Sequence, residues 1–394
     1  MRCFWQSPQT AEWFKERNYT LYKALELDGE PIDIYAPQIP SEDFVEAVYP
    51  YPYHDKFSGS FGPEYNRAFI AAEAVGVAQD SAGHHVAIKH VLVDSDELRI
   101  YEFLRKQSLE VMEENCILPI LDILYSKRIC FAVMPRWGEN VEYPHPSTLQ
   151  EVMFLMRSML KVSIGFSELK TDMSFPNCLV NHFSWSGRAN PKRAKLRREG
   201  RLSYAVFDFD ISVMVPEGVD SSKFRLPYKM SFYGNMFRPY DTAQGEPDYD
   251  PFAFDVGNLG QLWCSFYQHH SVDLPILAPL LDMMTTRKIK WRFTAQQALD
   301  FLEEQLVHMS QAALQVPYSV SPDWTAPYDE YDRWAHVPDG LARRWAAFRE
   351  PKLPWRVKLL RWIYSLRFVG PWIPALGREL ARITFGTGHY VYVP

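Results

Sequence analysis

The chain has 394 residues, 47% of them hydrophobic and 15% aromatic, which is enough apolar material to bury a large core. The formal net charge of −6 gives no reason to expect nucleic-acid binding. The five scattered cysteines form no Cys-x-x-Cys pair, so we expect reduced thiols. No apolar run resembles a secretory signal or reaches the roughly 18–20 residues that span a bilayer. We therefore expect an intracellular protein, cytoplasmic or nuclear, with no signal peptide or transmembrane span.

Residues 1–50 predict a short helix followed by an irregular arm. The helix is expected from Ala11 to Arg17, behind the capping residues Ser7 and Thr10. Prolines then interrupt any regular pattern, at positions 31, 37, 40, 50 and 52. We interpret this segment as an extension that packs on the next domain and takes no part in chemistry.

The next segment has the pattern of a β-hairpin. Residues 72–78 and 84–93 look like its two strands, and Gln79-Asp80-Ser81-Ala82-Gly83 supplies the turn. Lys89 lies on the second strand, directly after Val86-Ala87-Ile88. A helical run, 97–104, follows with Glu97 ahead of its apolar positions, and 116–124 and 129–134 then predict two more strands.

A polar loop follows the helix predicted for Ser147 to Lys161. In 170–181, an acid and an amide, Asp172 and Asn177, lie five residues apart, and Pro176 argues against a helix interior. A second apolar run, 204–207, ends at Asp208. Two short strands that bring these three side chains to one end would create a carboxylate–amide site for a hard cation such as Mg²⁺.

Between these two strands, residues 182–203 are strongly basic. They contain seven Lys and Arg residues and one acid, Glu199. We expect a solvated, mobile loop, with a nuclear-import signal or a patch for an acidic partner as alternatives.

The order Lys89, Glu97, Asp172-x-x-x-x-Asn177, Asp208-Phe209 resembles the catalytic core of eukaryotic protein kinases. Residues 254–260 resemble the buried aspartate helix of the kinase large lobe, and 280–299 resemble its closing helices. The resemblance covers roughly residues 60–305. It implies an α+β, bilobal fold with a small β-rich N-lobe, residues 51–135, and a larger α-helical C-lobe, residues 136–310, which contains the basic insertion 182–203. Residues 1–50 and 311–394 would be an N-terminal and a C-terminal extension.

The resemblance also implies ATP and Mg²⁺ as cofactors and a role for each matching residue. Lys89 would hold the α- and β-phosphates and pair with Glu97, or with Glu102 as the alternative. Asp172 would be the catalytic base, and Asn177 and Asp208 would bind the metal. The other implied roles are the gatekeeper, Met134; the hinge whose backbone grips adenine, Pro135-Arg136-Trp137; and a structural ion pair of Arg292 with Asp241, or else with Glu246.

The sequence departs from the family in four places. The glycine-rich loop is reduced to Phe57-Ser58-Gly59-Ser60-Phe61-Gly62, Lys170-Thr171 replaces His-Arg, the approach 163–169 is short, and Asp210 replaces a glycine. Two main readings stay open: a phosphotransferase that acts on a protein hydroxyl, in the family's commoner case of serine or threonine, and a pseudokinase scaffold that binds nucleotide or partners without turnover. A kinase-fold enzyme acting on a small molecule is a weaker third, and the sequence does not identify a substrate.

The C-terminal extension contains a Pro-, Trp- and Tyr-rich strap, 316–354, and then an amphipathic pattern. Its apolar positions fall on one helical face, flanked by Lys and Arg: Trp355, Leu359, Trp362, Ile363 and Leu366. We expect this face to dock on the large lobe. The alternative is peripheral contact of 352–368 with an anionic membrane surface.

Overall fold

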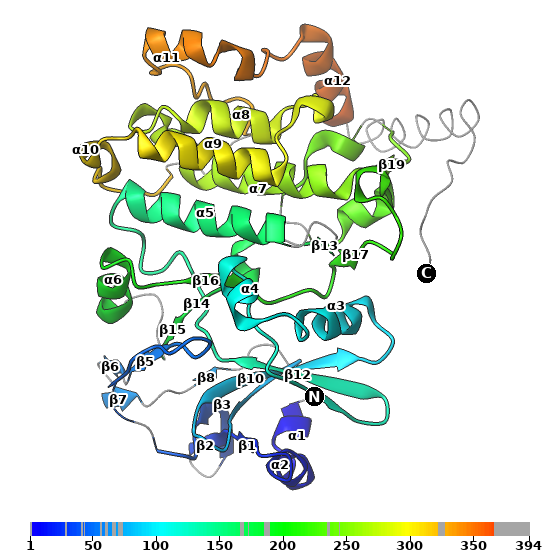
Figure 1. Ribbon diagram of the computed structural model, residues 1–394, viewed down its shortest axis with the longest axis vertical. Helices are drawn as coiled ribbons and strands as arrows, with labels where there is room; N and C mark the ends of the chain where they lie inside the picture. The colour runs from blue at the N-terminus through cyan, green and yellow to red at the C-terminus, as the bar shows by residue number, and fades with distance from the viewer. Residues whose placement is uncertain are drawn as a thin grey trace. The chain divides into compact units, whose positions relative to one another are not determined.

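The computed structural model is a mixed α+β protein (Figure 1). It describes residues 2–27, 30–40, 42, 44–55, 57–59, 62–64, 68–69, 74–165, 169–171, 173–184, 190–234, 237–243, 245–321 and 328–365. The chain divides into two compact units, which we call unit 1 (Met1–Gly165 and Phe175–Ser212) and unit 2 (Phe166–Ser174 and Val213–Pro394). This division does not fall at the predicted 135/136 boundary, because α5 (Leu149–Gly165) and residues 175–212 belong to unit 1.

A five-stranded antiparallel sheet forms the main sheet of unit 1. Its strand order is β1-β9-β10-β12-β11, with the bounds β1 Thr20–Leu21, β9 Val75–Gln79, β10 His85–Leu92, β12 Ile129–Pro135 and β11 Asp122–Tyr125. The predicted hairpin is confirmed as β9 and β10, and Lys89 lies opposite Ala132 in the β10–β12 ladder. The predicted strand 116–124 is shorter, since only Asp122–Tyr125 is extended.

The N-terminal segment contributes to the core of this sheet. Helices α1 (Arg2–Trp5) and α2 (Pro8–Lys15) bring Trp5 and Phe14 against Phe131 of β12. Gly76 of β9 is required here, because a Cβ at this position would lie 2.4 Å from the Trp5 ring. Burial of these aromatic rings stabilises unit 1 by several kcal/mol, at about 25 cal/mol per Å² of apolar surface.

The predicted irregular arm is wrong for most of residues 20–55. Besides β1, this segment forms β2 (Lys23–Leu27), β3 (Glu30–Ala36), β4 (Phe44–Val45) and β5 (Tyr53–Asp55). Four of the five prolines lie between strands rather than inside them, so they punctuate the strands and do not prevent them. The further short strands are β6 (Phe57–Gly59), β7 (Gly62–Glu64) and β8 (Ala68–Phe69).

Unit 1 contains two further ladders that involve residues 178–206, and three helices between residues 96 and 165. Strand β14 (Cys178–Val180) pairs antiparallel with β16 (Tyr204–Val206), and β15 (His182–Phe183) pairs parallel with β5. The helices are α3 (Asp96–Leu104), α4 (Leu109–Glu114) and α5. Ser95 and Ser108 cap α3 and α4 through their side chains, which accept backbone N–H groups of the first turn.

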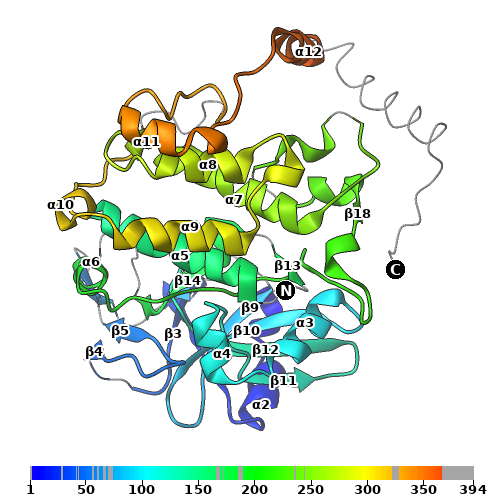
Figure 2. The same cartoon turned by 45° about the horizontal axis from the view of Figure 1, so that its top comes forward.

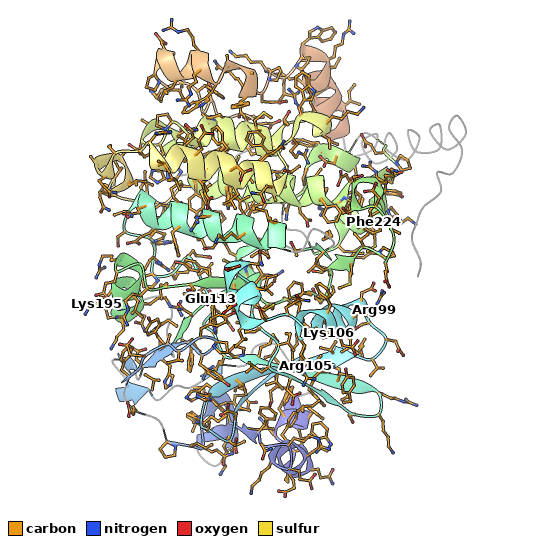
Figure 3. The ribbon with its side chains drawn as sticks, in the orientation of Figure 1. Arg99, Arg105, Lys106, Glu113, Lys195 and Phe224 are labelled. Atoms are coloured by element: carbon orange, nitrogen blue, oxygen red, sulfur yellow. The ribbon has the colours of Figure 1, made fainter. Side chains whose placement is uncertain are left out.

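The basic insertion 182–203 is not the solvated loop that we expected, at least from residue 190 onward. It contains α6 (Pro191–Arg198), and two of its arginines are buried, Arg193 at 1% and Arg197 at 6% exposure. Their guanidinium groups donate to backbone carbonyls of residues 139–144. Lys195 of the same helix is 68% exposed and points outward (Figure 3). Residues 185–189 lie outside the described part of the chain.

Unit 2 is built mainly from helices. Three of them are α7 (Pro251–Tyr267), α8 (Leu277–Thr285) and α9 (Ala295–Val307), and α8 packs on both α7 and α9 (Figure 2). Gly260 allows α7 to approach α8, because a Cβ at this position would lie 2.8 Å from the Met284 side chain. The remaining elements are β13 (Leu169–Lys170), β17 (Val213–Met214), β18 (Leu226–Pro227), β19 (Asp248–Tyr249), α10 (Gln311–Leu314), α11 (Asp339–Arg344) and α12 (Trp355–Ser365).

The predicted ion pair of Arg292 with Asp241 is confirmed, and Glu246 is not its partner. The two side chains are 2% and 4% exposed, and both guanidinium Nη atoms lie 2.7 Å from the carboxylate oxygens. The segment after residue 305 is also tied to unit 2. Arg333 and Trp334 donate to the Asp282 carboxylate of α8, each at 2.7 Å. In the part of the chain that the structure describes, no helix combines the length and the hydropathy needed to cross a bilayer.

Three buried histidines of unit 1 lie close together. The rings of His54 and His85 are 4.7 Å apart, and His182 contacts Asp55 at 3.2 Å. Burial lowers the pKa of His54 to about 4, and it also lowers the pKa values of His85 and His182. The three rings are therefore neutral in the folded protein at neutral pH.

We expect the free energy of unfolding to fall as the pH drops from about 6.5 to about 4. The pKa of His54 is 6.5 in the unfolded chain and about 4 in the folded protein. Between these two pH values the unfolded chain binds a proton at His54 that the folded protein does not bind, and this protonation favours the unfolded chain. For His54 alone the loss between pH 7 and pH 5 is roughly 2 kcal/mol. Urea unfolding at the two pH values measures it. His54→Gln should reduce the pH dependence, whereas His336→Gln, at an exposed position, should not; equal slopes in both variants would contradict the assignment.

Candidate functional site

Two of the predicted site residues, Glu97 and Asp208, contact the ammonium group of Lys89. Lys89 Nζ donates to Asp208 Oδ1 at 2.6 Å and to Glu97 Oε1. These three side chains are 8%, 23% and 11% exposed, so the pairs are largely shielded from water. Residues separated by up to 119 positions thus form one buried cation–carboxylate cluster within unit 1.

Helix α3 brings Glu97 to this cluster. Glu97 lies in the first turn of α3, directly behind the Ser95 cap, while Lys89 lies on β10. Tyr101, one turn further along α3, donates to Glu97 Oε1 at 3.0 Å and lies 3.1 Å from the Phe207 carbonyl. The alternative partner, Glu102, instead accepts from Tyr125. The structure therefore places Glu97, not Glu102, against Lys89.

Asn177 and Asp208 lie at the same end of the β14–β16 ladder. Cys178 is opposite Val206 in the antiparallel register, so Asn177 precedes the first pair and Phe207-Asp208 follows it. The Phe207 N–H donates to the Asn177 carbonyl at 3.3 Å, which continues the pairing. This is the arrangement that the two apolar runs predicted: one strand starts, and the other ends, beside an oxygen-bearing side chain.

The electrostatics of the cluster favour a charged lysine. Burial alone would lower the pKa of Lys89, but the charges of Asp208 and Glu97 outweigh it and hold the pKa above its usual value. Asp210 is exposed, and its N–H donates to Asp208 Oδ1 at 3.1 Å. Burial and the Asp208 charge raise the pKa of Asp210. The position at which protein kinases have a glycine therefore carries, in this chain, a second carboxyl group next to Asp208 in the sequence.

Asp172 lies outside the described residues, and its neighbour Thr171 is well placed in unit 2. The Thr171 N–H donates to Asp255 Oδ2 at 2.8 Å, and Asn258 Nδ2 lies 3.5 Å from the Met173 carbonyl. Asp255 is only 5% exposed. Helix α7 thus anchors the backbone on both sides of position 172.

The residues predicted to surround adenine, Met134, Arg136 and Trp137, contact other residues of the protein. Met134 is buried on β12 opposite Ala87. The Arg136 side chain donates to the Tyr22 hydroxyl at 2.7 Å and stacks over Phe183, and Trp137 Nε1 donates to the Pro50 carbonyl. Their backbone N–H groups also have partners: the N–H of Arg136 donates to the His85 carbonyl, and that of Trp137 to the Pro135 carbonyl.

Two further observations concern Tyr101, which the sequence interpretation did not use, and the reduced glycine loop. Tyr101 binds both Glu97 and the backbone beside Asp208, and its position four residues after Glu97 is the signal that could have revealed it. The reduced glycine loop forms part of a short hairpin, β6–β7, in which Gly59 pairs with Gly62. Residues 60 and 61 of that hairpin lie outside the described chain.

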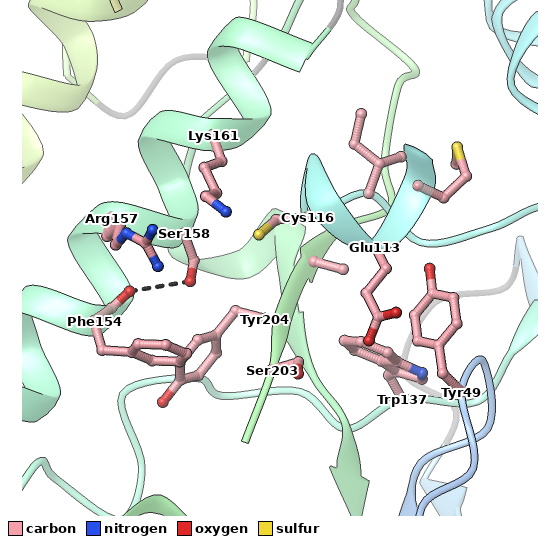
Figure 4. Close-up of a pocket in the computed structure, with 13 residues that line it drawn as sticks. Tyr49, Glu113, Cys116, Trp137, Phe154, Arg157, Ser158, Lys161, Ser203 and Tyr204 are labelled. Carbon is pink, nitrogen blue, oxygen red and sulfur yellow. Dashed lines mark hydrogen bonds between the residues drawn. The ribbon is translucent and has the colours of Figure 1, made fainter. Parts of the chain in front are cut away.

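A separate cavity of about 150 Å³ lies in unit 1, between α4, α5 and β16 (Figure 4). Arg157, Lys161 and Ser158 of α5 line one side, and Cys116 lies beside them. Burial raises the pKa of the Cys116 thiol, although the nearby Lys161 opposes this shift, so the thiol is protonated at neutral pH. Of the predicted site residues that the structure describes, Trp137 alone lines this cavity.

Within the described residues, no group of three or more His, Cys, Asp or Glu side chains is placed to hold a metal ion. This statement does not cover Asp172, which lies outside the described residues, or Asn177, which is an asparagine. Asp208 and Asn177 still supply the oxygen donors that Mg²⁺ prefers, at one end of one ladder. No protein-family model matches the chain, and no curated protein is similar to it in sequence.

Proposed function

We propose that the chain is a protein-kinase-like phosphotransferase, with a bilobal kinase-like fold, that uses ATP and Mg²⁺ to phosphorylate a protein hydroxyl, in the simplest case of serine or threonine. The observation that carries this proposal is the contact of Lys89 with both Glu97 and Asp208. The ion pair of Arg292 with Asp241 supports it, because the resemblance implies this pair. The hydrogen bond from the Thr171 N–H to Asp255 also supports it, because Asp255 lies in the segment that resembles the buried aspartate helix.

In this proposal Lys89 binds the α- and β-phosphates, and Glu97 keeps its ammonium in place. Lys89 would exchange its bond to Asp208 for bonds to phosphate oxygens, which frees one Asp208 oxygen. Asp172 would accept the proton of the attacking hydroxyl, on a backbone that Asp255 positions through Thr171.

Asn177 and Asp208 would hold the metal. When bound, Mg²⁺ neutralises the charge that develops on the phosphate oxygens. The fit depends on the chemistry of the donors: one carboxylate and one amide, with the Asp208 side chain 23% exposed and so open to a ligand. Asp210, whose backbone N–H donates to Asp208 Oδ1, adds a further carboxyl group next to Asp208 in the sequence.

The second candidate function is a pseudokinase scaffold. The observation that favours it is the hinge, where the backbone N–H groups of Arg136 and Trp137 donate to carbonyls of the protein itself. A purine could bind these donors only by displacing the internal bonds. The Lys170-Thr171 pair in place of His-Arg and the reduced glycine loop point in the same direction.

Nucleotide binding is tested by thermal unfolding. We expect saturating Mg²⁺-ATP to raise the melting temperature by roughly 2–5 °C, since a ligand at about 100 times its Kd stabilises a protein by about 2.7 kcal/mol. Asp208→Ala and Lys89→Met should abolish the increase, and Asp300→Ala, at an exposed position on α9, should keep it. An unchanged melting temperature of the wild-type chain would exclude both the phosphotransferase and a nucleotide-binding scaffold.

Phosphate transfer separates the two candidates. Autophosphorylation with radiolabelled ATP is expected in the wild-type chain and not in Asp172→Asn. If the wild-type chain binds ATP but incorporates no more phosphate than Asp172→Asn, the scaffold function is the correct one.

A further inference from the structure

Helix α12 exposes an apolar stripe. Trp355, Leu359 and Trp362 are 69%, 47% and 61% exposed. At 100° per residue these positions fall within about 60° of one another around the helix. The expectation that this face docks on the large lobe is therefore wrong for these three side chains.

The stripe lies in a basic part of the chain. Residues 351–365 contain four basic residues and no Asp or Glu, in a chain whose net charge is −6. The basic residues are Lys352, Arg356, Lys358 and Arg361. Arg356 and Lys358 are exposed, and the Arg356 guanidinium lies 5.7 Å from the centre of the Trp355 ring. A partner that covers this surface must accept both indole rings and several cations.

We propose that α12 binds in the plane of a membrane surface that contains anionic lipids, with Trp355, Leu359 and Trp362 in the interfacial layer and the surrounding cations on the lipid headgroups. Tryptophan is favoured at this depth, because its ring is apolar and its N–H can still reach water or a headgroup. The helix has 11 residues, about half of what a spanning helix needs, so it would lie on the membrane and not cross it.

Charge distinguishes this partner from the alternatives. A second copy of the chain would bring the same cations against each other, which opposes self-association through this face. An anionic bilayer offers many acidic groups together with an apolar layer, and the stripe needs both. This inference does not depend on the proposed phosphotransferase function.

The test is co-sedimentation of the full chain with vesicles of phosphatidylcholine alone and with 30% phosphatidylserine. We expect about tenfold stronger partitioning into the phosphatidylserine vesicles, weakening as salt is added. The double variant Trp355→Ser/Trp362→Ser should lose about tenfold in partitioning. Trp291→Ser is the matched control: Trp291 is 63% exposed but lies outside α12. The three replaced rings are largely exposed, so unchanged melting temperatures would show that every variant is folded.

Three results would overturn the proposal. The first is equal partitioning into both vesicle types, and the second is full binding by the double variant. The third is a wild-type chain that self-associates through α12 without binding vesicles, seen by light scattering as a larger mass that the double variant lacks.

Arg356→Gln/Lys358→Gln should reduce binding to phosphatidylserine vesicles alone, and an unchanged affinity would contradict the electrostatic part of the proposal.

Discussion

Replacing Arg193 with alanine is expected to lower the free energy of unfolding by roughly 3–5 kcal/mol. The Arg193 side chain is 1% exposed, and it donates to the carbonyls of Glu139, Tyr143 and His182 at 2.8, 3.1 and 2.9 Å. Burial lowers the pKa of Arg193 to about 10, so the guanidinium stays charged at neutral pH. Without it these buried carbonyls lose their donors, and the loop after Trp137 loses the group that fixes its backbone.

Urea unfolding followed by circular dichroism measures this effect. Arg198→Ala is the matched control, because it removes an exposed arginine from the same helix and should change the free energy of unfolding by less than about 0.5 kcal/mol. Arg193→Lys should recover only part of the stability, since an ammonium cannot reproduce the planar fork of donors. Equal effects of the two alanine variants would show that the carbonyl contacts contribute nothing.

Asp282→Ala is expected to destabilise unit 2 by roughly 3–5 kcal/mol and to release residues 328–350 from it. The Asp282 carboxylate is 3% exposed and accepts from Arg333, from the Trp334 ring N–H and from the Glu350 backbone N–H. Arg333 is itself 5% exposed, so removal of the carboxylate leaves a buried cation whose remaining partners, Gln268, the Cys264 thiol and the Tyr328 carbonyl, are neutral.

Limited proteolysis together with thermal unfolding detects this loss. In Asp282→Ala, cleavage within 328–350 should become faster at temperatures where the wild-type segment is protected. Asp282→Asn should have a smaller effect, because it keeps acceptor oxygen and shape but not the charge. The prediction fails if Asp282→Ala is cleaved at the wild-type rate and melts at the wild-type temperature.

Much of the Lys89 site was predictable because its members lie in or beside strongly patterned segments. The run before Lys89 and the run before Asp208 are both apolar and β-branched or aromatic, so their strand character is visible in the sequence. Asp241 and Arg292 were also paired correctly. Only the kinase resemblance could join them, since no local pattern links residues 51 positions apart.

The roles of Arg193 and Arg197 could not be predicted for a different reason. Their partners are backbone carbonyls, which every residue has, so nothing in the sequence indicates which loop they bind. A basic run with a single acid is typical of a solvated loop, and here the same run is partly a buried helix. The Asp282 contacts were missed similarly, because Arg333 and Glu350 lie more than 50 residues away in a Pro- and Trp-rich segment.

The contacts of Asp282 also change where the folded protein ends. The resemblance to protein kinases stops near residue 305, and a chain cut at residue 310 would look complete by that criterion. Such a truncation would strip one buried carboxylate of its cation, its indole donor and its backbone donor at once. We therefore expect the smallest stable version of unit 2 to extend to about residue 350, because buried residues of this segment, such as Arg333 and Trp334, pack within the unit.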